Sequence, residues 1–203
     1  MGHPYLGMFF LLFSGLCDTF DGKVARTKKD RTPQMKKFGI QIDSLSDLIA
    51  FGILPACIGI AMLRYIMYIP DLSGFTKYIL THYNLQAQIV LTAIAVLYVL
   101  AAMIRLAYFN VMEEERQSKT EENRKTYEGL PVTSVSLILP LFYSFRRDIG
   151  RIFPDLYAFL LLIIAIAFVT RIKLKKPKMK TMLIFVGVGG LEFLWLLFKY
   201  KIK

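Results

Sequence analysis

Long apolar blocks, separated by short charged segments, follow one another along this sequence. Six blocks can be delimited, at residues 4–20, 40–69, 86–109, 130–145, 156–170 and 181–198. A helix that crosses a membrane needs about 20 apolar residues, and the second, third and sixth blocks reach or approach that length. The fourth and fifth blocks are shorter, at roughly 15 residues, so each could instead be a buried helix or half of a tight hairpin. The pattern predicts six helices.

Composition narrows the class of protein. The chain has 203 residues, of which 55% are hydrophobic, and its mean hydropathy is +0.47. It is therefore too apolar for an ordinary soluble domain and too short for several domains. We expect residues 1–203 to form one all-α integral membrane domain, a bundle of about six transmembrane helices. Pro55 and Pro140 lie inside apolar blocks, where neighbouring helices can satisfy the freed carbonyls, so we expect kinks and not helix ends.

The charged residues indicate how the chain is oriented in a membrane. The 26 Lys and Arg outnumber the 15 Asp and Glu, and many of them gather in the short segments 23–37 and 171–180. Basic residues between apolar blocks are typical of cytoplasmic loops, not of a nucleic-acid-binding surface. We therefore expect both segments on the cytoplasmic side and no nucleic acid as partner. The polar segment 113–128 is expected to be a solvated helix or loop.

Four aspartates stand at the ends of two apolar blocks, on either side of one charged segment. Asp18 and Asp21 are three residues apart and Asp43 and Asp47 are four apart, so each pair projects from one face of a helix. Four ionised carboxylates at one place repel one another unless one or two divalent cations bind between them. Oxygen ligands favour Mg²⁺, Mn²⁺ or Ca²⁺ over zinc. The alternative is that the aspartates only cap helices and solvate a loop.

The neighbouring residues point to a phosphate-bearing substrate. Mg²⁺ commonly shares its coordination between carboxylates and substrate phosphates. Arg26 adds a planar set of donors suited to a diphosphate. Gly22, Ala25 and Gly39 would let the backbone approach a bulky ligand closely. Together these residue types indicate a nucleotide diphosphate.

The aspartates also resemble a known motif, that of the CDP-alcohol phosphatidyltransferases, D-x-x-D-G-x-x-A-R, a spacer, then G-x-x-x-D-x-x-x-D. All eight fixed positions are present, as Asp18, Asp21, Gly22, Ala25, Arg26, Gly39, Asp43 and Asp47. The spacer 27–38 is longer than usual in the family, which lengthens the cytoplasmic turn. The resemblance implies two Mg²⁺ or Mn²⁺ ions, held by Asp18, Asp21 and Asp43, with Asp47 as general base in contact with the second ion. It further implies that the CDP diphosphate is bound by Asp21, Gly22, Ala25, Arg26 and Gly39.

Two later stretches resemble the phosphatidylserine synthases of this family. Residues 105–110 read RLAYFN, similar to R-L-A-R-F-N with Tyr108 at the second arginine, and residues 128–131 read EGLP, similar to a G-L-P motif. The resemblance implies transfer of a phosphatidyl group from CDP-diacylglycerol to L-serine, with release of CMP. Arg105 and Asn110 are our candidates for serine binding, because a guanidinium can hold a carboxylate. The alternative is that Arg105 reaches toward lipid head groups.

Other functions stay open at this point. A second member of the family, with glycerol phosphate or inositol phosphate as acceptor, is the main alternative, and a non-catalytic membrane protein that binds cations is another. The resemblance implies a homodimer, and the basic segment 23–37 between the two pairs of aspartates predicts an active site at the cytoplasmic face of the bilayer. Relatives normally have a further helix before the one that ends in the first aspartates. This sequence begins where that helix would have ended, so we expect it to be absent.

Overall fold

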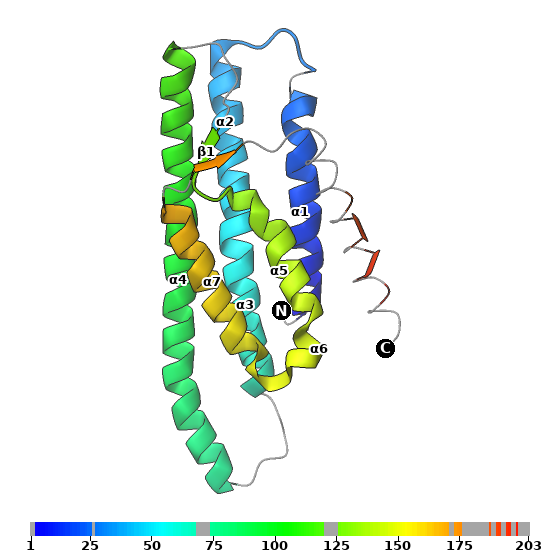
Figure 1. Cartoon of the computed structure of the whole chain (residues 1–203), viewed down its shortest axis with the longest axis vertical. Coiled ribbons are helices and arrows are strands. Elements are labelled where there is room, and N and C mark those ends of the chain that lie inside the picture. Colours follow the sequence, from blue (N-terminus) through cyan, green and yellow to red (C-terminus); the bar gives the residue numbers. More distant parts are fainter. Residues whose placement is uncertain are drawn as a thin grey trace.

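The computed structural model describes residues 3–25, 27–67, 74–119, 126–170 and 173–175, and isolated positions between 187 and 198. Over these residues the chain is helical, apart from short loops and one two-stranded ribbon (Figure 1).

The elements have the following bounds. The helices are α1 (Pro4–Ala25), α2 (Pro33–Asp47), η1 (Leu48–Ile53), α3 (Leu54–Met67), α4 (Gly74–Lys119), η2 (Val132–Ser134), α5 (Val135–Ser144), α6 (Arg146–Ile149), η3 (Gly150–Ile152) and α7 (Phe153–Val169). The strands β1 (Thr126–Glu128) and β2 (Lys173–Lys175) pair antiparallel. Here η1 is a π-helical turn, whereas η2 and η3 are 3₁₀ turns. Because α2, η1 and α3 follow without a break, they form one continuous helix.

Five of the six apolar blocks form helices as predicted, and the sixth, 181–198, lies largely outside the described residues. Two predicted extents are wrong. The second helix begins at Pro33 and not at residue 40, and the third runs over Gly74–Lys119, well beyond the block 86–109. In both cases polar residues continue the helix past its apolar part, which hydrophobicity alone does not mark. The ribbon of β1 and β2 was not predicted from the all-α pattern.

The helices pack side by side around one apolar core. α4 packs along α7 and α3, while α1 packs against α5 and α3 (Figure 1). Two tyrosines of this core are wholly buried, and each donates its hydroxyl to a backbone carbonyl of the continuous helix. Tyr98 of α4 bonds the carbonyl of Phe51 at 2.6 Å, and Tyr157 of α7 bonds that of Pro55 at 3.0 Å. As predicted, Pro55 and Pro140 lie inside helices that continue past them.

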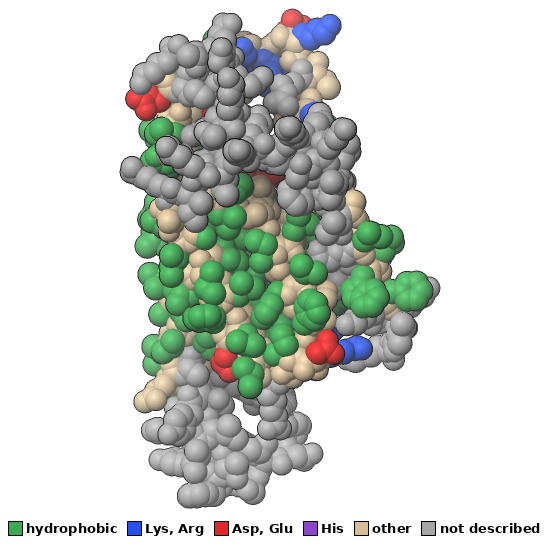
Figure 2. Space-filling model, viewed as in Figure 1, with side chains coloured by type: hydrophobic (Ala, Val, Ile, Leu, Met, Phe, Trp, Pro, Cys, Tyr) green, Lys and Arg blue, Asp and Glu red, His purple; other side chains and the backbone are tan. Residues whose placement is uncertain are grey.

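The outward faces of the helices are strongly apolar. Figure 2 shows hydrophobic side chains across the middle of one face, with charged side chains toward the two ends of that region. Exposed examples on different helices are Phe10, Ile89 and Phe159. Among the residues that the structure describes, two helical stretches could cross a membrane by length and composition, Pro33–Met62 and Gln88–Glu115, and two shorter apolar ones are Val132–Ser144 and Phe153–Val169.

The contact between α1 and α5 depends on a glycine. A Cβ atom placed on Gly15 of α1 would overlap Oγ and Cβ of Ser136 on α5. Glycine therefore lets the two helices approach closely. Because α1 also carries Asp18 and Asp21, this contact determines where those carboxylates lie relative to the core.

We expect Gly15→Ala to lower the free energy of unfolding by about 1–3 kcal/mol, the usual cost of overpacking a core. Thermal unfolding of the purified protein in detergent measures this loss. Ser136→Gly in the same chain should recover part of it by removing the atoms that clash. Gly39→Ala is the matched control, since an added Cβ there meets nothing within 4 Å. An equal loss of stability in Gly15→Ala and Gly39→Ala would contradict the packing argument.

Candidate active site

The end of α1 presents the first pair of aspartates. Asp18 and Asp21 lie on its last two turns, and the three-residue spacing places both on one side of the helix. Asp18 is half-buried and Asp21 is exposed. The backbone N–H of Gly22 donates to the carboxylate of Asp21, which restrains that side chain.

The second pair stands on α2, whose start is determined by two residues that the hydrophobic pattern missed. The Thr32 hydroxyl accepts a hydrogen bond from the Met35 N–H at 3.2 Å, and Pro33 occupies the first turn. Threonine at the cap followed by proline is a common way to begin a helix, so this pair was a usable signal. Because α2 begins there, Asp43 and Asp47 lie near its end, one turn apart, where the π turn η1 begins.

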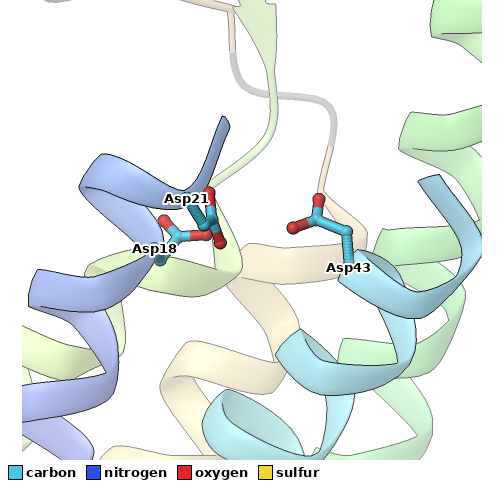
Figure 3. A group of neighbouring side chains, drawn as sticks. All are labelled: Asp18, Asp21 and Asp43. Carbon is cyan, nitrogen blue, oxygen red and sulfur yellow. The ribbon is translucent and has the colours of Figure 1, made fainter. Parts of the chain in front are cut away.

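The two helices bring these carboxylates together. In Figure 3, Asp18 and Asp21 of α1 face Asp43 of α2. One carboxylate oxygen from each of the three residues lies within 4.8 Å of the others. The Asp47 carboxylate lies close enough to that of Asp18 for the two to interact electrostatically, so the fourth aspartate adjoins the same group. All four predicted aspartates therefore meet in one place.

This donor set suits a hard divalent cation. Mg²⁺ takes oxygen ligands at about 2.0–2.1 Å and Ca²⁺ at about 2.3–2.6 Å, so opposite ligands stand about 4–5 Å apart. The oxygens of Asp18, Asp21 and Asp43 are no more than 4.8 Å apart, so one ion could reach all three. Carboxylates this close repel one another unless a cation or a shared proton lies between them. The residues present thus fit Mg²⁺ or Mn²⁺.

Small residues border the carboxylates on both helices. Gly22 and Ala25 follow Asp21 on α1, and Gly39 precedes Asp43 by one turn on α2. Gly39 is exposed, with nothing within 4 Å of the position of a Cβ atom. The surface beside Asp43 is therefore open to a ligand. Arg26, the predicted partner of the diphosphate, lies outside the described residues.

Arg105 is bound to the backbone of the segment that precedes α5. Its side chain is 6% exposed, and its Nε and Nη2 donate to the carbonyls of Leu130 and Gly129 at 3.0 and 3.3 Å. Gly129 has a φ of +80°, a conformation that glycine adopts readily, and an added Cβ would lie 3.3 Å from Arg105 Nε. Arg105 therefore holds the glycine and leucine of the G-L-P stretch.

Asn110 contacts the aspartate-bearing helix directly. Its Nδ2 donates to the hydroxyl of Ser44 at 2.7 Å, and Ser44 is the neighbour of Asp43 in sequence. The stretches 105–110 and 128–131, which are far apart along the chain, are thus joined to each other and to α2. The sequence reasoning did not single out Ser44. Its position between Asp43 and Asp47 was the available signal.

Comparison with known proteins agrees with this grouping. The CDP-diacylglycerol--serine O-phosphatidyltransferase of Saccharomyces cerevisiae is 32% identical over 150 residues, which cover 73% of this chain and 44% of that protein. Proteins of the same name from Helicobacter pylori and Methanocaldococcus jannaschii are each 28% identical, over 67% and 66% of this chain and 45% and 49% of those proteins. The chain spans about half the length of these relatives.

The chain also matches the sequence pattern of a whole protein family. The family described as CDP-alcohol phosphatidyltransferase matches residues 1–198, a range that includes both pairs of aspartates and the later stretches around Arg105 and Gly129. The chain belongs to the CDP-alcohol phosphatidyltransferase family.

Proposed function

We propose that this chain transfers the phosphatidyl group of CDP-diacylglycerol to the hydroxyl of L-serine, forming phosphatidylserine and CMP. The observation that carries the proposal is the convergence of the Asp18, Asp21 and Asp43 oxygens within 4.8 Å, at the positions of the family motif. Serine as acceptor is supported by the names of the relatives and by the RLAYFN and EGLP stretches.

Each motif residue has a role in this proposal. Asp18, Asp21 and Asp43 hold one or two Mg²⁺ or Mn²⁺ ions, with Asp47 beside them. A bound divalent cation supplies positive charge that stabilises the diphosphate and the departing CMP. The CDP-binding residues are Asp21, Gly22, Ala25, Arg26 and Gly39.

Asp47 is the proposed general base. The serine hydroxyl oxygen forms a bond to the phosphorus of the phosphatidyl group, and the bond from that phosphorus to the oxygen of CMP breaks. The hydroxyl proton then passes to the Asp47 carboxylate, which must lie within hydrogen-bond reach of the alcohol. The proximity of Asp47 to Asp18 supports this role, because the base would then adjoin the carboxylates that hold the metal.

Arg105 and Asn110 are the proposed serine-binding residues. Both extend from α4, Arg105 to the carbonyls of Gly129 and Leu130, and Asn110 to Ser44, the neighbour of Asp43. This arrangement supports an acceptor site between α2 and the segment before α5. Transfer to glycerol phosphate or inositol phosphate is the alternative within the family, and the choice of acceptor in the assay below distinguishes them.

We further propose that the protein is a multi-pass membrane protein whose active site faces the cytoplasm. In the described part of the chain, two helices are long and apolar enough to cross a membrane, and apolar side chains cover the outward faces; both features support this placement. The basic segment 23–37, adjoining the aspartates, supports the cytoplasmic side. A homodimer is part of the same proposal, on the resemblance to the family alone.

Release of CMP from CDP-diacylglycerol should require both serine and a divalent cation. The assay uses the purified protein with serine, glycerol 3-phosphate or inositol phosphate, each in Mg²⁺ and in Mn²⁺. We expect turnover with serine, and its loss in excess EDTA, because the carboxylates cannot bind the diphosphate without a cation. Full turnover in EDTA would refute the metal requirement. Turnover only with another acceptor would refute serine.

Asp43→Asn and Asp47→Asn should separate a metal ligand from a base. Asparagine keeps the shape of aspartate but removes its charge. Asp43→Asn should weaken metal binding, so that excess Mn²⁺ restores some activity. Asp47→Asn should leave binding of CDP-diacylglycerol largely intact while kcat falls by about 10²–10⁴, the usual contribution of a positioned base. If both variants lose substrate binding equally, Asp47 is primarily a ligand and not the base.

Arg105→Lys should raise the KM for serine roughly 10- to 100-fold, the cost of losing a hydrogen bond that involves a charged group. Lysine cannot donate along two directions in one plane as arginine does. The KM for CDP-diacylglycerol should change much less. Arg146→Lys is the control, since Arg146 lies over the Tyr143 ring at the other end of α5. Equal changes in both KM values would assign Arg105 to the fold alone.

A further inference from the structure

The helix that carries Asp43 and Asp47 changes its hydrogen-bond pattern directly after Asp47. In η1 the Leu54 N–H donates to the carbonyl of Ile49, five residues back, in place of the usual four. One extra residue in a helical turn rotates the side chains before the turn by about 100° about the helix axis, relative to those after it. The π turn therefore determines which way the α2 aspartates face relative to the buried helix α3. Turns of this kind occur frequently at functional sites.

Pro55 leaves one carbonyl of this turn without its usual donor. In a regular α-helix the carbonyl of Phe51 would accept from the N–H of residue 55, and proline has none. The Tyr98 hydroxyl of α4 donates to that carbonyl instead, at 2.6 Å. Both Tyr98 and Phe51 are at most 1% exposed, so water does not reach this carbonyl and an unpaired group would be costly. Tyr98 thus takes the place of the missing backbone donor.

Helix α4 also bonds the continuous helix on the other side of Asp47. Asn110 donates to Ser44, three residues before Asp47, while Tyr98 donates to Phe51, four residues after it. Two hydrogen bonds from one helix therefore bracket Asp47. Held at two points along its length, the segment cannot rotate about its own axis without breaking one of these bonds.

We propose that Tyr98 is a positioning residue for phosphatidyl transfer. Through the carbonyl of Phe51 it maintains the π turn, and through that turn it maintains the rotation of α2 that directs Asp43 and Asp47 toward the carboxylates of α1. This inference rests on the proposed metal-dependent function and adds a residue that neither the motif nor the acceptor-site hypothesis includes.

Tyr157 is a matched control that distinguishes a positioning role of Tyr98 from a purely structural one. Tyr157 of α7 is equally buried and donates to the carbonyl of Pro55 at 3.0 Å, one turn farther along and beyond the π turn. Tyr157→Phe removes the same chemical group from the same core. This variant should lower the stability of the protein. It should not change the direction of the aspartates, because the lost bond lies beyond the π turn and the rotation of α2 relative to α3 is kept.

Mn²⁺ binding, measured by electron paramagnetic resonance on the purified metal-free protein, is the primary test. In Tyr98→Phe we expect the apparent Kd for Mn²⁺ to rise by about 10- to 100-fold, as for other residues that orient metal ligands. In Tyr157→Phe it should equal the wild-type value, although both variants melt at lower temperature. In the transferase assay, kcat of Tyr98→Phe should fall while KM for serine is unchanged, and excess Mn²⁺ should restore part of kcat.

Pro55→Ala provides a second test that does not depend on how well Tyr98→Phe folds. Alanine supplies the backbone N–H that can donate to Phe51, so the π turn can revert to a regular α-helical turn. We expect a melting temperature at or above that of the wild type, since proline in a helix interior is unfavourable, together with weaker Mn²⁺ binding. A gain in stability with a loss of metal affinity is not expected of a residue that only packs.

Wild-type Mn²⁺ affinity in both Tyr98→Phe and Pro55→Ala would overturn this inference and leave the proposed function intact. If Tyr98→Phe does not fold, the affinity of Pro55→Ala decides the question alone. A wild-type protein that neither binds Mn²⁺ nor releases CMP would overturn the proposed function, and this inference with it.

Discussion

Repulsion among carboxylates is the constraint on which the rest of this structure depends. Asp18, Asp21 and Asp43 bring oxygens within 4.8 Å of one another, and Asp47 lies beside Asp18, so repulsion among the carboxylates opposes assembly of the metal-free site. The helices must therefore be held by contacts outside the site. On one side the close approach of α1 to α5 at Gly15 does this, and on the other the hydrogen bonds of α4 to α2 and η1 do. A cation would then bind to carboxylates that are already in place, which would lower the cost of ordering them.

The continuous helix from α2 to α3 meets two demands that a regular helix would not meet together. Its second half buries residues such as Ile58 and Met62 in the core, whereas no residue of α2 is buried, so the aspartates stand out from the bundle. The apolar side chains of α3 must face the core and the aspartates of α2 must face α1, and a single regular helix would not direct both sets correctly. The π turn supplies the difference at the junction, and Pro55 makes a return to the α-helical pattern unfavourable there.

The sequence was sufficient for the apolar helices and for the meeting of the four aspartates, because both follow from spacing along single helices. It was not sufficient for the start of α2, where a threonine cap and a proline extend the helix into polar residues, or for the full length of α4. The π turn and the bonds of Arg105 and Asn110 escaped prediction for another reason. The bonded residues are far apart in the sequence: 24 residues for Arg105 and Gly129, 47 for Tyr98 and Phe51, and 66 for Asn110 and Ser44. Hydrophobic periodicity carries no information on such pairs.

The donors of these long-range bonds all lie on α4, which suggests how the proposed metal-binding and acceptor-binding sides are coupled. Tyr98 and Arg105 are seven residues apart on α4, which places them on one face two turns apart, and Asn110 follows within a further turn and a half. From this one helix, Tyr98 bonds the turn after Asp47, Arg105 bonds the segment at Gly129, and Asn110 bonds the neighbour of Asp43. A helix resists bending over so short a length, so the proposed metal-binding and acceptor-binding sides are held at a constant separation. The proposed phosphatidyl transfer would need that separation to be constant, since the attacking hydroxyl and the phosphorus must meet within a few tenths of an ångström of the productive geometry.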